Sequence, residues 1–120
     1  MNAVAKAIAA GWFVLAQAGT VRAAEVWFPT DAVVDVTRPP SAAKPDDGVD
    51  DTDAIQRAIT DSVDTGRMVF FPSGVYDLSR SLVAKNHKGN WCAHLTLQGQ
   101  GRDRTVLRLA DGAKGFGDAA

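Results

Sequence analysis

The segment from Lys44 to Ile59 reads KPDDGVDDTDAIQRAI and joins a turn to a helix. A turn is expected in its first half, because Pro45 fixes φ, Gly48 adopts conformations closed to other residues, and aspartate side chains bond nearby N–H groups. Its second half predicts an amphipathic helix that Gly66 ends. The apolar residues recur at helical spacing and form one stripe: Ile55, Ala58, Ile59 and Val63.

Carboxylates and a hydroxyl surround the start of this helix. An oxygen atom there can accept a hydrogen bond from an unpaired N–H group, and negative charge is favourable at the positive end of the helix dipole. Either Asp51 or Thr52 is predicted to cap the helix. A capping box is the alternative, with Asp53 as the cap and Gln56 reaching back.

The same carboxylates raise the question of a calcium loop. In an EF-type loop with Gly48 at the sixth position, Ala43 would stand at position one and Ala54 at position twelve, and neither offers an oxygen ligand from its side chain. We therefore predict turn and capping roles for the acidic residues and no metal site. These residues are Asp46, Asp47, Asp50, Asp51 and Asp53.

Short apolar runs separated by turns predict strands elsewhere in the chain. They are Val33–Val36, Met68–Phe71, Val75–Leu78, Ser81–Val83, Leu95–Leu97 and Thr105–Leu109. The separation of Val69 from Leu95 along the chain is typical of stacked coils, although a β-sandwich could produce similar runs. The helix favours the solenoid, because a stacked coil needs a terminal cover with one apolar face. Trp27 and Phe28 are expected to pack on the body.

Three motifs occur in a fixed order: PDDGVDDTDAIQRAI from Pro45, VFFPSGVY from Val69, and LTLQGQGR from Leu95 with TVLRL from Thr105. Together they resemble the first part of the pectate lyase superfamily. The resemblance implies a mostly β fold: the first coils of a right-handed parallel β-helix (solenoid) with an N-terminal capping α-helix. The segment RPPSAA at 38–43 differs from the Phe-Gly-Ala that such proteins often carry there, which leaves the path of the first strand open.

Residues 1–23 have the layout of a secretory signal peptide. Lys6 precedes an apolar run from Ala7 to Ala18, and Val21-Arg22-Ala23 forms a small-residue cleavage site. The run is too short for a membrane helix, which needs about 20 residues. We expect cleavage after Ala23, export to the periplasm or beyond, and no membrane attachment afterwards. Residues 24–120 would then be the N-terminal part of a truncated β-helix domain.

Composition argues against a nucleic-acid partner. Of the 120 residues 22% are charged, the formal net charge is −1, and 13 of the 14 acidic residues are Asp, which favours turns. The arginines at 102, 104 and 108 are expected to lie on a solvated face. The segment QGQG at 98–101 lacks the third glycine and the helix of a dinucleotide-binding fingerprint, so it is interpreted as a turn and we predict no cofactor.

Few residues are candidates for catalysis. Cys92 is the only cysteine, and His94 shares its face of a strand, but this spacing does not make a dyad, so a packing role is preferred. His87 lacks ligands at zinc spacing and is expected in a wet loop. Asp77 is an isolated acid in a strand, without the second carboxylate that glycoside hydrolysis needs. The catalytic residues therefore remain unknown.

The resemblance implies a carbohydrate-active protein whose catalytic groove lies on later coils. We expect this chain to be the opening part of a secreted polysaccharide hydrolase or lyase acting on pectin-like or related glycans, with hydrolysis favoured. Calcium would be needed only by a lyase. The alternative is a noncatalytic, glycan-binding surface or tailspike-like β-helix. Substrate and oligomeric state are left open.

Overall fold

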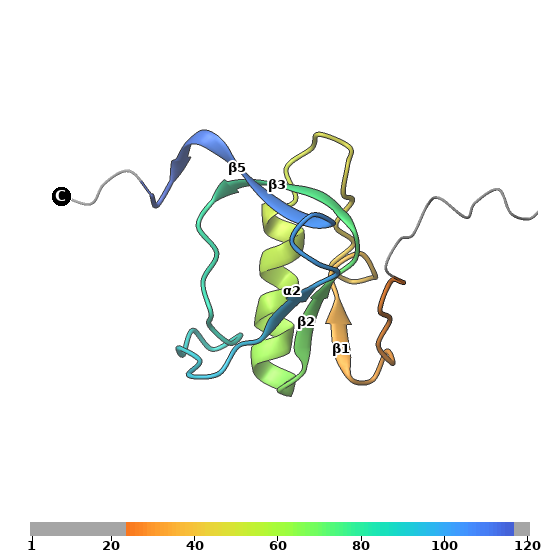
Figure 1. The fold of residues 1–120 in the computed structure, drawn as a ribbon. Helices are drawn as coiled ribbons and strands as arrows, with labels where there is room; N and C mark the ends of the chain where they lie inside the picture. Colours follow the sequence, from red (N-terminus) through yellow and green to blue (C-terminus); the bar gives the residue numbers. More distant parts are fainter. Residues whose placement is uncertain (1–23, 117–120) are drawn as a thin grey trace, which may run out of the picture.

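The computed structural model describes residues 24–116, which form a small domain of mostly strands with one helix (Figure 1). In chain order the elements are β1 (Val33–Asp35), α2 (Thr52–Thr65), β2 (Met68–Phe71), β3 (Gly74–Arg80), β4 (Leu97–Gly99) and β5 (Thr105–Lys114). The predicted signal peptide at 1–23 lies outside the described residues.

The described strands form two sheets in which every pairing is parallel. One sheet has the order β1-β2-β4, and the other contains β3 and β5. Val69 of β2 pairs with Leu97 of β4, and Val75 of β3 pairs with Val106 of β5. The chain thus returns to a neighbouring position in both sheets after segments of similar length.

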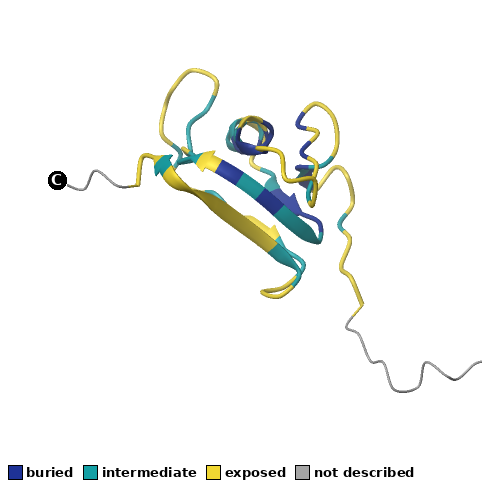
Figure 2. Ribbon diagram, turned by 90° about the horizontal axis from the view of Figure 1, so that it is seen from above, coloured by how far each residue is buried: buried dark blue, intermediate teal, exposed yellow. Residues whose placement is uncertain are grey.

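Helix α2 covers one side of this arrangement. It packs against β1, β2 and β3, and in the view from above β3 lies between α2 and β5 (Figure 2). The predicted stripe is confirmed, since Ile55, Ala58 and Ile59 are buried and Val63 packs on the core. Gly66 ends the helix in the left-handed conformation, with φ of 73°, as expected.

Burial falls steeply from the helix towards β5. The core contains β2 and alternate residues of β3, including Phe70, Phe71 and Tyr76, whereas β5 is exposed along most of its length (Figure 2). Trp27 and Phe28 pack edge-on against Phe70, as predicted. Among the described strands nothing pairs with the outer edges of β4 and β5.

Several boundaries differ from the sequence-based prediction. The strand predicted at 81–83 is irregular, because the backbone N–H and C=O of Val83 both bond to the side-chain amide of Gln56. For the same reason Gln56 does not complete a capping box. The first strand ends at Asp35, β4 starts only at Leu97, and β3 and β5 extend beyond their predicted ends.

Candidate functional site

The acidic turn at 45–48 packs on the glycine of the second motif. Val75 N–H donates to the Asp46 carboxylate at 2.9 Å, and Asp46 N–H donates to the Val75 carbonyl at 2.8 Å. A Cβ atom on Gly74, whose φ is 141°, would lie 2.5 Å from Cβ of Pro45. The first two motifs therefore occur together because their backbones are in close contact.

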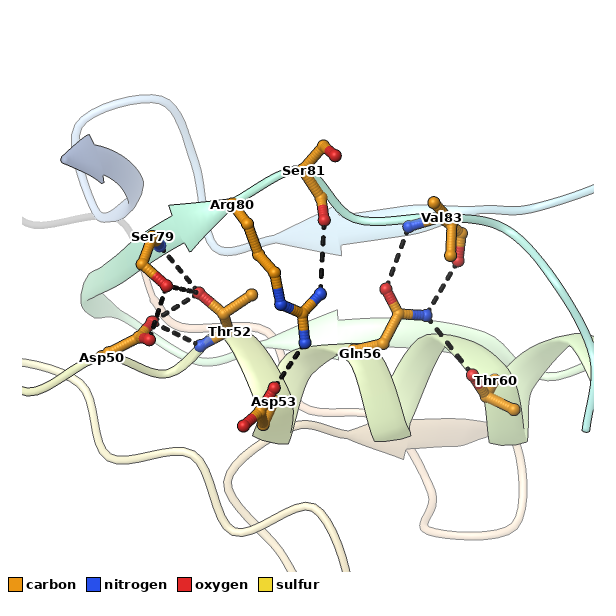
Figure 3. Close-up of polar contacts among 9 residues, drawn as sticks. All are labelled: Asp50, Thr52, Asp53, Gln56, Thr60, Ser79, Arg80, Ser81 and Val83. Atoms are coloured by element: carbon orange, nitrogen blue, oxygen red, sulfur yellow. Dashed lines mark hydrogen bonds and ion pairs between the residues drawn. The ribbon is translucent and has the colours of Figure 1, made fainter. Parts of the chain in front are cut away.

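A set of polar contacts then ties α2 to β3 and the segment after it (Figure 3). We call it the helix-docking network, and it consists of Asp50, Thr52, Asp53, Gln56, Ser79, Arg80 and Val83. Ser79 N–H donates to Thr52 Oγ1 at 2.8 Å, and the Ser79 hydroxyl donates to Asp50 Oδ2 at 2.6 Å. The Thr52 hydroxyl also donates to Asp50, and Arg80 pairs with Asp53. These carboxylates therefore have structural partners.

The N-cap residue is one of the two predicted, but the side chain that bonds the first turn is not. Asp51 occupies the N-cap position, but its side chain makes no capping bond and accepts instead from Lys44 N–H at 3.0 Å. Asp50 accepts from Thr52 N–H at 2.9 Å in its place. Hydrogen bonds, first from the Ser79 hydroxyl and then from Thr52, hold the pKa of Asp50 below its ordinary value of 3.8.

Asp51 has the opposite electrostatic environment. Its side chain is buried, and Oδ2 finds no hydrogen-bond donor among the described residues. Desolvation therefore raises the pKa of this carboxyl above 3.8, against the effect of the bond from Lys44 N–H. The nearby carboxylates of Asp47 and Asp77 add to this rise, and the bond from Lys44 N–H ties Asp51 to the preceding turn.

Asp77 is not free to act as a general acid or base. Arg108 of β5, its register partner, donates to it from Nε at 2.6 Å and from Nη2 at 3.1 Å. Asp50 is the neighbour of Asp77 on the other side, through a parallel bridge, but its carboxylate is held by Thr52 and Ser79. The structure thus supplies a second acid beside Asp77 that the sequence did not reveal, and both carboxylates are already engaged.

The other candidates are not brought together. Cys92 Sγ contacts the backbone carbonyl and N–H of His94, not its imidazole, so the pair is no catalytic dyad. His87 lies in an exposed loop, as predicted, and contacts Asp64 of α2. Among residues 24–116 no group of three or more His, Cys, Asp or Glu side chains is arranged to hold a metal ion.

Two cavities differ in the residues that line them. One of about 340 Å³ lies outside β1, and its charged side chains pair with each other, Arg38 with Asp35 and Arg67 with Asp61. The other, of about 280 Å³, is lined by Phe71, Leu97, Thr105 and Leu107 at the exposed edge of the sheets. Neither cavity presents an unpaired carboxylate pair.

Comparison with known proteins identifies the family. A family model described as rhamnogalacturonase A/epimerase, pectate lyase-like, matches residues 40–118. The chain belongs to this family. The resemblance of the three motifs to pectate lyase-like proteins is thereby confirmed.

The pectate lyase-like domain also has a structural counterpart. The crystal structure of the Agl-KA catalytic domain is similar with a TM-score of 0.62 and 24% sequence identity. The match covers 74% of this chain but only 15% of that one. No curated protein matches this chain at a significant level. Within residues 24–116 there is no helix of the length and apolar character that a membrane span requires.

Two features of the surface were missed by the sequence analysis. The Asp77–Arg108 pair depends on the register of two strands distant in sequence, which local pattern does not reveal. The second feature is an exposed tryptophan stacked against a lysine in the 84–92 loop, a segment that the sequence analysis places only between strands. The available signal was a tryptophan in a segment otherwise rich in lysine, asparagine and histidine.

Proposed function

We propose that this chain forms the first coils of a right-handed parallel β-helix in a longer, secreted enzyme that cleaves pectin-like or related polysaccharides. The observation that carries the proposal is the match of a rhamnogalacturonase A/epimerase, pectate lyase-like model to residues 40–118. The parallel registers of β2 with β4 and of β3 with β5 support the solenoid, because successive coils must return to the same sheets. The unpaired outer edges of β4 and β5 offer the next coil a template.

Catalysis is assigned to coils beyond those described. The span of only 15% of the Agl-KA catalytic domain supports this assignment, as do the structural partners of Asp50, Asp53 and Asp77. We favour hydrolysis by a pair of carboxylates, which requires no cofactor. A lyase would instead require calcium. The proposed location is the periplasm or the exterior of the cell, after removal of residues 1–23.

Activity assays on the full-length protein test the reaction. Polygalacturonate, rhamnogalacturonan and a neutral glucan are incubated with the protein, with and without a calcium chelator. New reducing ends without unsaturated products, unaffected by the chelator, are expected for the hydrolase. Unsaturated products that disappear when the chelator is added would instead identify a calcium-dependent elimination and would contradict hydrolysis.

The alternative is a noncatalytic glycan-binding β-helix. It is favoured by the engagement of Asp50 and Asp77, the two neighbouring acids, in bonds to Ser79 and Arg108. Binding of a polysaccharide without release of any ends would establish this alternative. A crystal structure of the full-length protein in which the chain after β5 does not pair in parallel with β5 would refute the solenoid itself.

A further inference from the structure

The loop at residues 84–92, here the Trp91 loop, projects from the sheets between β3 and β4 (cyan in Figure 1). Its two arms are held together by hydrogen bonds. Cys92 N–H donates to the Ala84 carbonyl at 2.9 Å, and Asn86 N–H donates to the Asn90 carbonyl at 3.0 Å. Lys85 and Trp91 form an antiparallel bridge between them. The loop is therefore a defined structure and not a loose connection.

Further contacts fix the tip and its orientation. The Asn86 side-chain oxygen accepts from the N–H groups of Lys88 and Asn90, at 2.9 Å in each case. The tip is attached to the end of α2 through His87, whose backbone and ring both contact the Asp64 carboxylate. A surface held in this way loses little conformational entropy when it binds a ligand.

Trp91 is the most unusual residue of the loop. Its exposed fraction of 70% is the highest of any large hydrophobic side chain among the described residues. The Lys85 ammonium group lies 4.4 Å from the centre of the ring, in cation–π contact. The residue thus combines an accessible aromatic surface with an adjacent positive charge.

The charges of the loop and the segments next to it indicate which kind of ligand it could bind. Residues 78–102 contain no Asp or Glu but include Arg80, Lys85, Lys88 and Arg102, within a chain whose formal net charge is −1. Arg80 is paired with Asp53, whereas Lys88 is exposed at the tip of the Trp91 loop. The loop itself therefore carries two lysine charges, those of Lys85 and Lys88, beside the Asp64 carboxylate that His87 contacts, and the lysines favour an anionic group on a ligand.

We propose that the Trp91 loop is a binding surface for an acidic polysaccharide. A sugar ring would stack on the Trp91 indole, and uronate carboxylates would pair with the ammonium groups of Lys85 and Lys88. The choice of a polysaccharide over another polyanion rests on the proposed function.

Titration of the full-length chain with polygalacturonate tests the proposal, with affinity followed by calorimetry. Trp91→Ala is expected to weaken binding about tenfold, the loss of about 1.4 kcal/mol, because the stacking surface is removed. Lys88→Ala is expected to weaken it about two- to fivefold, as is typical for an exposed ion pair. Fully methyl-esterified galacturonan, which lacks the carboxylate charge, should bind several-fold more weakly than polygalacturonate.

Matched controls are available in the same chain. Trp27→Phe alters another exposed tryptophan, and Lys44→Ala removes another exposed lysine, so both should leave the affinity unchanged. Circular dichroism of each variant checks that the fold persists. Equal affinities of Trp91→Ala and the wild type would overturn the proposal, as would an oligonucleotide that binds the loop as tightly as polygalacturonate.

The binding result is independent of turnover. A full-length protein that cleaves polyuronides while Trp91→Ala binds normally would refute the binding surface and leave the proposed enzyme intact. Binding that depends on Trp91 and Lys88 in a protein without any turnover would support the surface and contradict the enzyme.

Discussion

The Thr52→Val substitution tests whether the helix-docking network holds α2 in place. Thr52 is 1% exposed, and its hydroxyl accepts from Ser79 N–H at 2.8 Å while donating to Asp50. Valine keeps the shape of the side chain but removes the oxygen, so the Ser79 N–H is left without its acceptor and Asp50 loses a donor. A typical hydrogen bond contributes about 0.5 to 1.5 kcal/mol, and a bond to a charged group about 1.5 to 3 kcal/mol. Since Ser79 and Asp50 are both exposed, water replaces part of each lost bond, and we expect a total loss of about 1 to 2 kcal/mol.

Hydrogen exchange of the amides in α2, followed by mass spectrometry on the full chain, measures this loss. A destabilisation of that size should accelerate exchange of the helix about 5- to 30-fold, since about 1.4 kcal/mol corresponds to a factor of ten. Thr52→Ser is the matched control, because it keeps the hydroxyl and removes only a methyl group. If Thr52→Val exchanged no faster than Thr52→Ser, the hydroxyl bonds would not be what secures the helix.

Three further outcomes are expected. Ile59→Asp places a carboxylate at a position that is 2% exposed, so it should lower the free energy of unfolding by more than about 3 kcal/mol, measured as a large fall in the melting temperature of the full-length protein. An unchanged melting temperature would show that the buried face of the helix is assigned wrongly. Because burial raises the folded-state pKa of Asp51, its charged form lowers the stability at neutral pH, and this loss is relieved as the pH falls through the raised pKa towards 3.8. Asp51→Asn should therefore be more stable than the wild type at pH 7 and should lose that advantage near pH 4. Urea titrations that give the same difference in stability at both pH values would contradict this. Expressed from Ala24 to residue 120, the chain should be poorly stable or associate, since β4 and β5 leave their outer edges unpaired, whereas a sharp, reversible melt of a monomer in analytical ultracentrifugation would speak against exposed edges as a liability.

Local pattern predicts the parts of this molecule that depend on near neighbours in sequence. The stripe of Ile55, Ala58 and Ile59 lies on the core because helical spacing alone brings these side chains to one face. Gly66 ends the helix because the left-handed conformation suits glycine. The strand Met68–Phe71 has its predicted ends, since a short apolar run bounded by turn residues has few other options.

The start of the helix was harder to predict because several oxygen atoms compete there. Asp50, Asp51, Thr52 and Asp53 could each have capped the helix by local geometry. Contacts with other segments decide among them. Lys44 N–H donates to Asp51, Arg80 pairs with Asp53, and Ser79 N–H donates to the Thr52 hydroxyl. Asp50 is left to accept from the first turn.

The sequence by itself determined the helix, the main strands and the family, because the spacing of apolar residues and the three ordered motifs are local properties. Only the tertiary structure decided which side chains meet across the turns. The Gln56 side chain bonds to the backbone of Val83, the Asp77 carboxylate pairs with Arg108, and the Lys85 ammonium group lies over the Trp91 ring once the arms of the loop have paired. For Asp77 and Arg108 the physical reason is register, because a shift of one residue between the parallel strands would turn Arg108 to the opposite face and no pattern within one strand specifies that register. The other two contacts depend on how the chain folds back after β3, which local pattern does not specify either.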